Sequence, residues 1–288
     1  DQLDPKVYEL FDGYVHNQFS RREFMDRLSV YAVGGLTIPA ILDYLLPKYQ
    51  EAQKVKPNDP RLDSAYIYYE SPNGGGTMKA LLSKPKDATE KLPGVVVVHE
   101  NRGLNPHIED VGRRVALEGF VSIAPDALTP LGGYPGNDDA GRELQRQRDK
   151  GEMLEDFIAA FQYLAQHPAC TGSVGVVGFC FGGWVSNMMA VKVADLKAAV
   201  PFYGGQPSAE EVPAIQAPLL LHFGGLDERV NAGWPAYEAA LMEHQKAYTA
   251  CFYPEVKHGF HNDTTPRFDE EAASLAWTRT IEFFRAHL

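Results

Sequence analysis

Five short apolar runs recur between residues 95 and 223, and helix-length segments separate most of them. The runs are Val95–His99, Phe120–Ala124, Val174–Phe179, Ala198–Phe202 and Leu219–Phe223. A continuous apolar run of this length is typical of a strand that is buried on both faces, as the strands of a parallel sheet are. The alternation of such strands with helices predicts an α/β fold, in which a mostly parallel central sheet is flanked by helices.

Further elements are expected on both sides of these runs. Tyr66–Glu70 and Met78–Ser83 predict a β-hairpin, because the turn-forming residues Asn73-Gly74-Gly75-Gly76 separate them. Thr249–Tyr253 predicts a last strand, and the apolar spacing within Asp269–His287 predicts a long final helix. Between the strands, helices are expected at Asp110–Glu118, Glu152–Gln166 and Trp184–Val193.

A length of 288 residues fits either one domain or two. The alternation of strands and helices begins only after residue 60, and Pro57–Asp59 has the composition of a linker. We therefore expect an N-terminal helical extension over residues 1–60 and one α/β domain over residues 61–288. Within that domain the Gly- and Pro-rich segment Thr129–Asp139 is expected to form a long surface loop.

The extension raises the question of export. Residues 20–25 read Ser-Arg-Arg-Glu-Phe-Met, which resembles a twin-arginine signal, and a fairly apolar run over residues 30–46 follows. Pro39 and Asp43 interrupt that run, and it is too short to span a membrane. We therefore expect a cytoplasmic protein, with periplasmic export by the twin-arginine route as the alternative. The apolar residues expected to pack against the α/β domain are Leu28, Leu36, Ile41 and Leu45.

The net charge narrows the classes of binding partner that are expected, and the number of cysteines predicts a free thiol. The formal net charge of -11 makes the average surface repel polyanions, and no run of Lys and Arg offsets it. Nucleic acid and membranes are therefore not expected as partners, while a homo-oligomer stays open. The three cysteines Cys170, Cys180 and Cys251 cannot all be paired, so at least one free thiol is expected.

Cys180 lies in the segment with the strongest chemical signal. The sequence Gly178-Phe179-Cys180-Phe181-Gly182-Gly183 connects a predicted strand to a predicted helix. In a nucleophile elbow of this kind the flanking glycines let strand and helix approach closely, and the nucleophile lies at the helix N-terminus. The helix dipole there favours a thiolate over a thiol. The alternative is a small, inert cysteine that fills a glycine-rich turn.

A nucleophile of this type needs an acid and a histidine later in the chain, each after a strand. Asp227 follows the strand Leu219–Phe223, and His258 follows Thr249–Tyr253. Both lie in the required order, so a Cys180-His258-Asp227 triad is predicted. The neighbouring Glu228 is a competing acid, and a turn or helix cap is the alternative role of Asp227.

Two other histidines do not change this prediction. His261 follows His258 by three residues, which could suit a metal, but no third ligand stands at a conventional spacing. We therefore expect neither a metal nor another cofactor, and we interpret His261 as a loop residue. His222 lies inside an apolar strand and is expected to be a core residue.

The combination of motifs resembles the dienelactone hydrolase family of the α/β-hydrolases. It comprises the elbow at Cys180, His99-Glu100-Asn101-Arg102-Gly103 after a buried strand, Gly224 to Asp227, and His258-Gly259-Phe260. The resemblance implies that Glu100 pairs with the thiol in the resting enzyme and moves away when substrate binds. A local capping role is the alternative for Glu100.

This resemblance implies a specific activity. We expect a cysteine-dependent hydrolase of small-molecule lactones or activated carboxylic esters, acting through a thioester acyl-enzyme, because a thiolate expels stable leaving groups best. The oxyanion hole would use the backbone N–H groups of Phe181 and Asn101. Arginines that could bind a substrate carboxylate are Arg102, Arg142, Arg146 and Arg267. The alternative is a catalytically idle scaffold for ligand binding or assembly.

Overall fold

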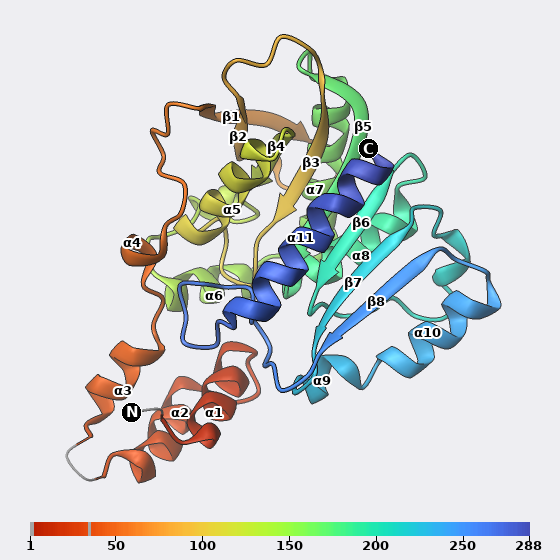
Figure 1. Cartoon of the computed structure of the whole chain (residues 1–288). Coiled ribbons are helices and arrows are strands. Elements are labelled where there is room, and N and C mark those ends of the chain that lie inside the picture. Colours follow the sequence, from red (N-terminus) through yellow and green to blue (C-terminus); the bar gives the residue numbers. More distant parts are fainter. Residues whose placement is uncertain (1–2, 34–35) are drawn as a thin grey trace.

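The central feature of the computed structural model, which describes residues 3–33 and 36–288, is an eight-stranded sheet (Figure 1). Its strand order is β1-β2-β4-β3-β5-β6-β7-β8. The first two strands pair antiparallel, β2 pairs antiparallel with β4, and all later pairs are parallel. The predicted α/β fold class is therefore confirmed. The strands are β1 Leu62–Ser71, β2 Gly76–Pro85, β3 Leu92–Val98, β4 Val121–Pro125, β5 Cys170–Phe179, β6 Ala198–Phe202, β7 Leu219–Gly224 and β8 Tyr248–Tyr253.

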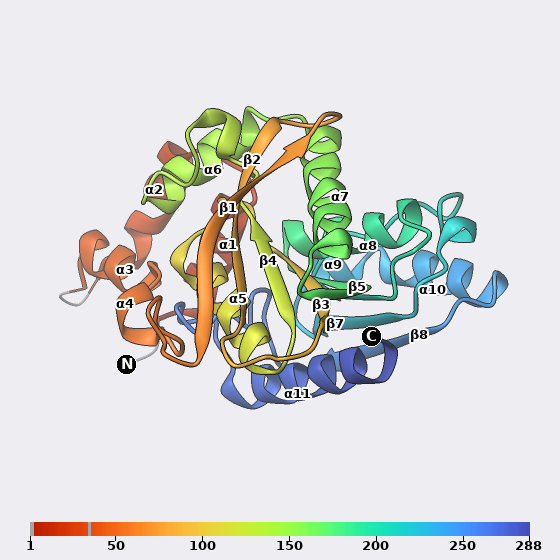
Figure 2. The same ribbon diagram turned by 90° about the horizontal axis from the view of Figure 1, so that it is seen from above.

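Helices cover both faces of this sheet (Figure 2). One face packs against α7 (Lys150–Gln166), α8 (Phe181–Lys192) and α10 (Trp234–Glu243). The other packs against α5 (Pro106–Leu117) and α11 (Glu270–His287). In β3, Val96 and Val98 belong to the first hydrophobic core while Val95 and Val97 belong to the second. This division explains the continuous apolar run, because both faces of an inner strand are buried.

Element boundaries differ from the sequence prediction where local capping decides them. Helix α5 begins earlier than expected, because Asn105 accepts a hydrogen bond from the N–H of Ile108 and Pro106 occupies the first turn. The expected loop Thr129–Asp139 contains a short 3₁₀ turn, η2 (Thr129–Leu131), and ends where α6 (Asp138–Arg146) begins. Its last residues are therefore helical rather than loop.

The N-terminal part consists of four short helices, and the first three of them form a small core of their own. They are α1 (Pro5–Val15), α2 (Arg21–Leu28), α3 (Ile38–Leu45) and α4 (Tyr49–Ala52), and the 3₁₀ turn η1 (Ser29–Tyr31) follows α2. The expectation that Leu28, Leu36, Ile41 and Leu45 all pack against the α/β domain is wrong. Leu36 is 38% exposed. The other three are buried with one another and with Val7, Tyr8, Phe11, Val15 and Phe24, because short amphipathic helices bury their apolar faces together.

Arg21 and Arg22 lie in the first turn of α2. Ser20 accepts a hydrogen bond from the N–H of Glu23, and the Glu23 carboxylate accepts one from the N–H of Ser20, which forms a capping box. Residues 34 and 35 of the expected apolar run lie outside the described residues. In the ranges that are described, none of the helices has the length and apolar character needed to cross a membrane.

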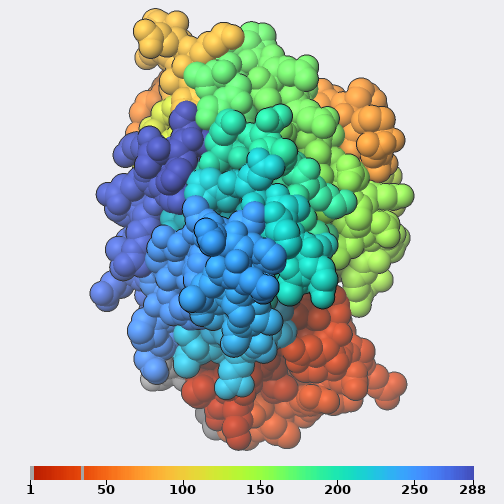
Figure 3. Space-filling view, turned by 90° about the vertical axis from the view of Figure 1, so that its right-hand side faces the viewer, coloured from red at the N-terminus to blue at the C-terminus, as the bar shows by residue number. Residues whose placement is uncertain are grey.

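The N-terminal helices lie at the end of the sheet where the parallel strands have their carboxyl ends (Figure 1). In the space-filling view they contact the segment that follows β7 (Figure 3). One specific contact is a hydrogen bond of 2.6 Å from the Asn101 side chain to the carbonyl oxygen of Val15 at the end of α1. The extension therefore covers the edge at which α/β proteins carry their functional residues.

Candidate active site

Cys180 forms the sharp turn between β5 and α8. Its backbone angles, φ 57° and ψ −110°, are strained for a residue other than glycine. A Cβ atom on Gly178 would lie 2.0 Å from the carbonyl oxygen of Gly182, and one on Gly182 would lie 2.4 Å from that of Val98. Only glycine therefore fits at these two positions, and the strand and helix hold Cys180 at the predicted place.

Asp227 and His258 approach Cys180 from the loops after β7 and β8. The Nδ1 atom of His258 lies 2.5 Å from Oδ2 of Asp227, and both side chains are buried. Asp227 also caps the short helix α9 (Glu228–Asn231) by accepting a hydrogen bond from the N–H of Val230. The two roles foreseen for Asp227 are therefore compatible, since its two carboxylate oxygens have different partners.

A second histidine, His16, reaches the sulfur from the extension. Its Nε2 atom lies 3.3 Å from Sγ of Cys180, and its ring lies edge-on to that of His258 with 4.6 Å between ring centroids. Its Nδ1 atom is 2.8 Å from the carbonyl oxygen and 3.2 Å from the carboxylate of Asp12, one turn earlier in α1. Sequence reasoning missed this residue. The only signal was an Asp and a His four residues apart on a helix.

The charges around the sulfur favour the thiolate. Burial raises the pKa of the Cys180 thiol, but the nearby His16 and His258 together outweigh it and lower the pKa to about 5. Burial also lowers the pKa of His258, while Asp227 and the thiolate raise it to about 10. The pKa of His16 is raised in the same way, because Cys180 and Asp12 outweigh its burial. A thiolate next to imidazolium is the reactive form of such a site.

Glu100 is not at the sulfur in this structure. Its side chain is buried, with Oε2 3.2 Å from the guanidinium of Arg102 and 3.1 Å from the side-chain nitrogen of Asn262. Burial raises the pKa of Glu100, but Arg102 and other nearby cations outweigh it and keep the carboxyl ionised. Among the described residues, His16 lies at hydrogen-bond distance from the Cys180 sulfur, and His258 also interacts with it.

The backbone N–H groups of Phe181 and Asn101 remain available as oxyanion donors. Phe181 is the first residue of α8, where an N–H has no partner within the helix. In the part of the chain that the structure describes, neither N–H makes a hydrogen bond. A free N–H donor is what a developing oxyanion requires, so both groups stay candidates for this role.

The four candidate arginines lie in different environments. Arg102 is buried in ion pairs with Glu100 and Asp138, and Arg142 pairs with Asp139 and lies over the ring of Tyr14. Arg146 is exposed and pairs with Glu143.

Arg267 differs from these three because it lines a cavity beside Asp227 and His258, with a volume of about 740 Å³. This cavity lies between α1 and the loops after β7 and β8, and His258, Asp227 and Asp12 also line it. Arg267 bonds Asp12 through one nitrogen, at 3.2 Å, while its buried Nε has no partner among the described residues. Of the four arginines, Arg267 is the one placed to meet a ligand beside His258.

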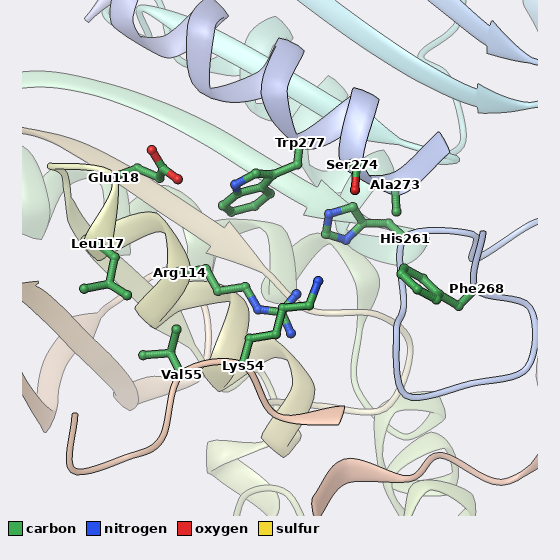
Figure 4. A pocket seen from close by; sticks show the side chains of 10 residues that line it. All are labelled: Lys54, Val55, Arg114, Leu117, Glu118, His261, Phe268, Ala273, Ser274 and Trp277. Carbon is green, nitrogen blue, oxygen red and sulfur yellow. The ribbon is translucent and has the colours of Figure 1, made fainter. Parts of the chain in front are cut away.

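His16, Cys180 and His258 together could also ligate a metal ion. Their ligand atoms all lie within 4.8 Å of one another. The other histidine considered from the sequence, His261, is turned away, because it stacks on Phe179 and lines a separate cavity beside Trp277 (Figure 4). His222 is a core residue as expected, bonded to the hydroxyl groups of Tyr253 and Thr280. The expectation of no bound metal stays a prediction.

Comparison with known proteins places the α/β part of the chain in a family. The model of the dienelactone hydrolase family matches residues 78–288. The chain belongs to the dienelactone hydrolase family. The predicted resemblance is thereby confirmed, and the protein is a hydrolase of ester or lactone bonds. A separate family model, described as YqhI-like, matches residues 1–33 and so includes His16.

Relatives of this dienelactone hydrolase family member cover different shares of the chain. A hydrolase fragment of Escherichia coli (strain K12), YghX, is 55% identical over 114 residues, which are 40% of this chain and 97% of the fragment. A Synechocystis protein named as a carboxymethylenebutenolidase is 34% identical and covers 75% of this chain and 95% of its own length. A crystal structure from Klebsiella pneumoniae, assigned as a dienelactone hydrolase, has a TM-score of 0.69 at 27% identity and covers 78% of this chain and 100% of that chain.

Proposed function

We propose that this protein is a cysteine-dependent hydrolase of lactones and activated carboxylic esters, of the carboxymethylenebutenolidase type, acting through a thioester acyl-enzyme. The observation that carries the proposal is Cys180 in a strained elbow beside a buried His258–Asp227 pair. The name of the Synechocystis relative supports a lactone as the substrate. Residues 61–288 form the catalytic domain in this proposal, and residues 1–60 form the extension.

In the acylation step the thiolate of Cys180 adds to the carbonyl carbon of the substrate. The carbonyl oxygen becomes an oxyanion, which the N–H groups of Phe181 and Asn101 stabilise. The intermediate then expels either the thiolate or the ester oxygen, and the thiolate is the better leaving group. An enol lactone favours the forward direction, because its oxygen leaves as a stabilised enolate.

In the deacylation step His258 acts as the general base. It removes a proton from water, whose oxygen adds to the thioester carbon, and the C–S bond breaks to restore the thiolate. Asp227 holds the ring through Nδ1, so that Nε2 faces the reaction. When the sulfur is acylated its negative charge is gone, which lowers the pKa of His258, so the ring releases its proton to solvent and can then accept one from water.

The cavity beside His258 is suited to a small substrate with a negative charge. Arg267 is the candidate that would bind a substrate carboxylate, because it lines this cavity and its buried Nε has no partner in the described part of the chain. All four arginines have a carboxylate partner, so what distinguishes Arg267 is its place in the lining of this cavity, whereas Arg102, Arg142 and Arg146 would instead hold the surrounding loops.

The test is hydrolysis of a panel of lactones and aryl esters by the wild-type protein and by Cys180→Ala. The variant should keep its circular dichroism spectrum and lose turnover, and undiminished turnover would contradict the proposal. A thiol-reactive probe separates the second candidate, an idle scaffold. The enzyme should show fast labelling at Cys180 that rises through a pH of about 5, whereas an idle scaffold should not.

For localisation we propose the cytoplasm. The twin-arginine-like segment forms the capped first turn of α2 and is thus part of the folded extension. Fractionation of cells that produce the full chain tests this, and recovery in the periplasm would contradict it.

A further inference from the structure

The proposed function uses one Asp–His pair at Cys180, but the structure has two. Asp227–His258 comes from the α/β domain, and Asp12–His16 comes from α1 of the extension. His16 makes the hydrogen bond to the sulfur, at 3.3 Å. Its side chain is only 11% exposed, so bulk water does not screen this contact strongly.

The surroundings of His16 determine which form of its ring fits. Nδ1 faces the carbonyl oxygen of Asp12 at 2.8 Å, and a carbonyl oxygen only accepts hydrogen bonds. Nε2 faces the sulfur, which as a thiolate also accepts. Only the doubly protonated imidazolium donates to both partners, so His16 can supply a proton beside the reacting sulfur.

We propose that His16 is a second catalytic histidine, which donates its Nε2 proton to the departing oxygen of the substrate and so extends the hydrolase to esters of simple alcohols. This inference rests on the proposed cysteine mechanism. It assigns Asp12 as a positioning residue, which orients the ring through Nδ1.

The proton transfer completes acylation for a poor leaving group. The S–C bond has formed, the C–O bond of the ester breaks, and its electron pair takes the Nε2 proton of His16, so that a neutral alcohol leaves. His16 is then neutral. Once the sulfur is acylated, His258 releases its proton to solvent. In deacylation it takes a proton from water, whose oxygen adds to the thioester carbon, and the C–S bond breaks to restore the thiolate. A proton from the carboxylic acid product or from solvent then returns His16 to the imidazolium form, which restores the resting state. Every proton in the cycle comes from water.

The extension also supplies part of the substrate site. Pro5, Tyr8 and Glu9 of α1 line the cavity of about 740 Å³ that reaches His258. The hydrogen bond from Asn101 to the carbonyl oxygen of Val15 ties the end of α1 to the loop that carries a proposed oxyanion donor. His16 is the next residue, so this contact sets the position of its backbone. The catalytic histidine and one wall of the cavity thus come from the same segment.

The experiment compares esters of one acid that differ only in the leaving group. His16→Gln keeps an amide near the position of Nε2 but has no acidic proton to give. We expect kcat/KM for the ethyl ester to fall by about 10²-fold, the lower end for general acid catalysis, and that for the 4-nitrophenyl ester to fall far less. The matched control is His287→Gln, because His287 is exposed, and it should change neither of the two kcat/KM values.

Three outcomes would overturn the inference. Equal losses on both esters would show that His16 does not act on the leaving group. Unchanged activity on both would show that His258 alone supplies the proton. Wild-type activity that disappears on dialysis against EDTA and returns with Zn²⁺ would make His16 a metal ligand instead. Cys180→Ala, measured alongside, separates these results from a failure of the proposed function, since it should abolish turnover of both esters.

Discussion

The two Asp–His pairs at Cys180 are chemically similar but are positioned in different ways. Asp227 and His258 follow adjacent parallel strands, β7 and β8, so the sheet brings them to one edge. Asp12 and His16 lie one turn apart at the end of α1, and they reach the sulfur only because the extension lies against that edge. The first pair is part of the fold, whereas the second depends on contacts across a boundary between two separate cores.

The largest expected effect concerns the pair in the α/β domain. His258→Gln should lower kcat by roughly 10⁴-fold on aryl and alkyl esters alike, because deacylation of either thioester needs the general base. A burst of product followed by accumulation of acyl-enzyme, measured by mass spectrometry, checks that acylation survives. If the loss were confined to one class of ester, the two histidines would not differ as proposed.

The aspartates give the next comparison. Asp227→Asn should cost roughly 10³-fold in kcat, because the amide no longer fixes the His258 ring in its required tautomer. Asp12→Asn should cost only about 10-fold on ethyl esters, because the carbonyl oxygen of residue 12 still accepts from Nδ1 of His16. Steady-state kinetics of the two variants on the same ester test the order, and a reversed order would contradict the division of roles.

The next prediction concerns substrate binding in the cavity that is lined by both the extension and the α/β domain. Arg267→Gln should raise KM for a lactone that carries a carboxylate by about 10-fold, the loss expected when a charge-assisted hydrogen bond is removed. The KM for a neutral ester should change much less. Arg146→Gln, on the exposed face of α6, is the matched control. A similar rise of KM for both substrates would show that Arg267 only supports the loop.

The smallest expected effect is a shift in pH dependence. The fraction of thiolate falls as the pH drops through about 5, so alkylation of Cys180 should slow on the acid side of that value. Removing the positive charge of His16 raises the pKa of the thiol, so in His16→Gln the decline should begin at a higher pH. The rate of iodoacetamide labelling against pH measures this. An unchanged midpoint would show that His258 alone sets the thiolate.

Much of the candidate site at the carboxyl ends of the strands could be predicted, because it depends on short sequence segments and on their order in the chain. The glycines around Cys180 are required by close backbone contacts, and the order of Cys180, Asp227 and His258 follows from their strands. The partners of Glu100 could not be predicted in this way. Arg102 and Asn262 hold its carboxylate, and Asn262 lies 162 positions away in the chain.

The sequence by itself determined the α/β architecture, the elbow and the family, because buried strands, turn glycines and chain order are properties of short segments. Only the tertiary structure decided that His16 lies at the sulfur, that Leu36 is exposed, and that Arg267 rather than Arg146 lines the cavity. The physical reason is that the extension has a core of its own, and its position depends on a few contacts between distant residues, such as Asn101 with Val15. No periodicity in the sequence encodes such contacts.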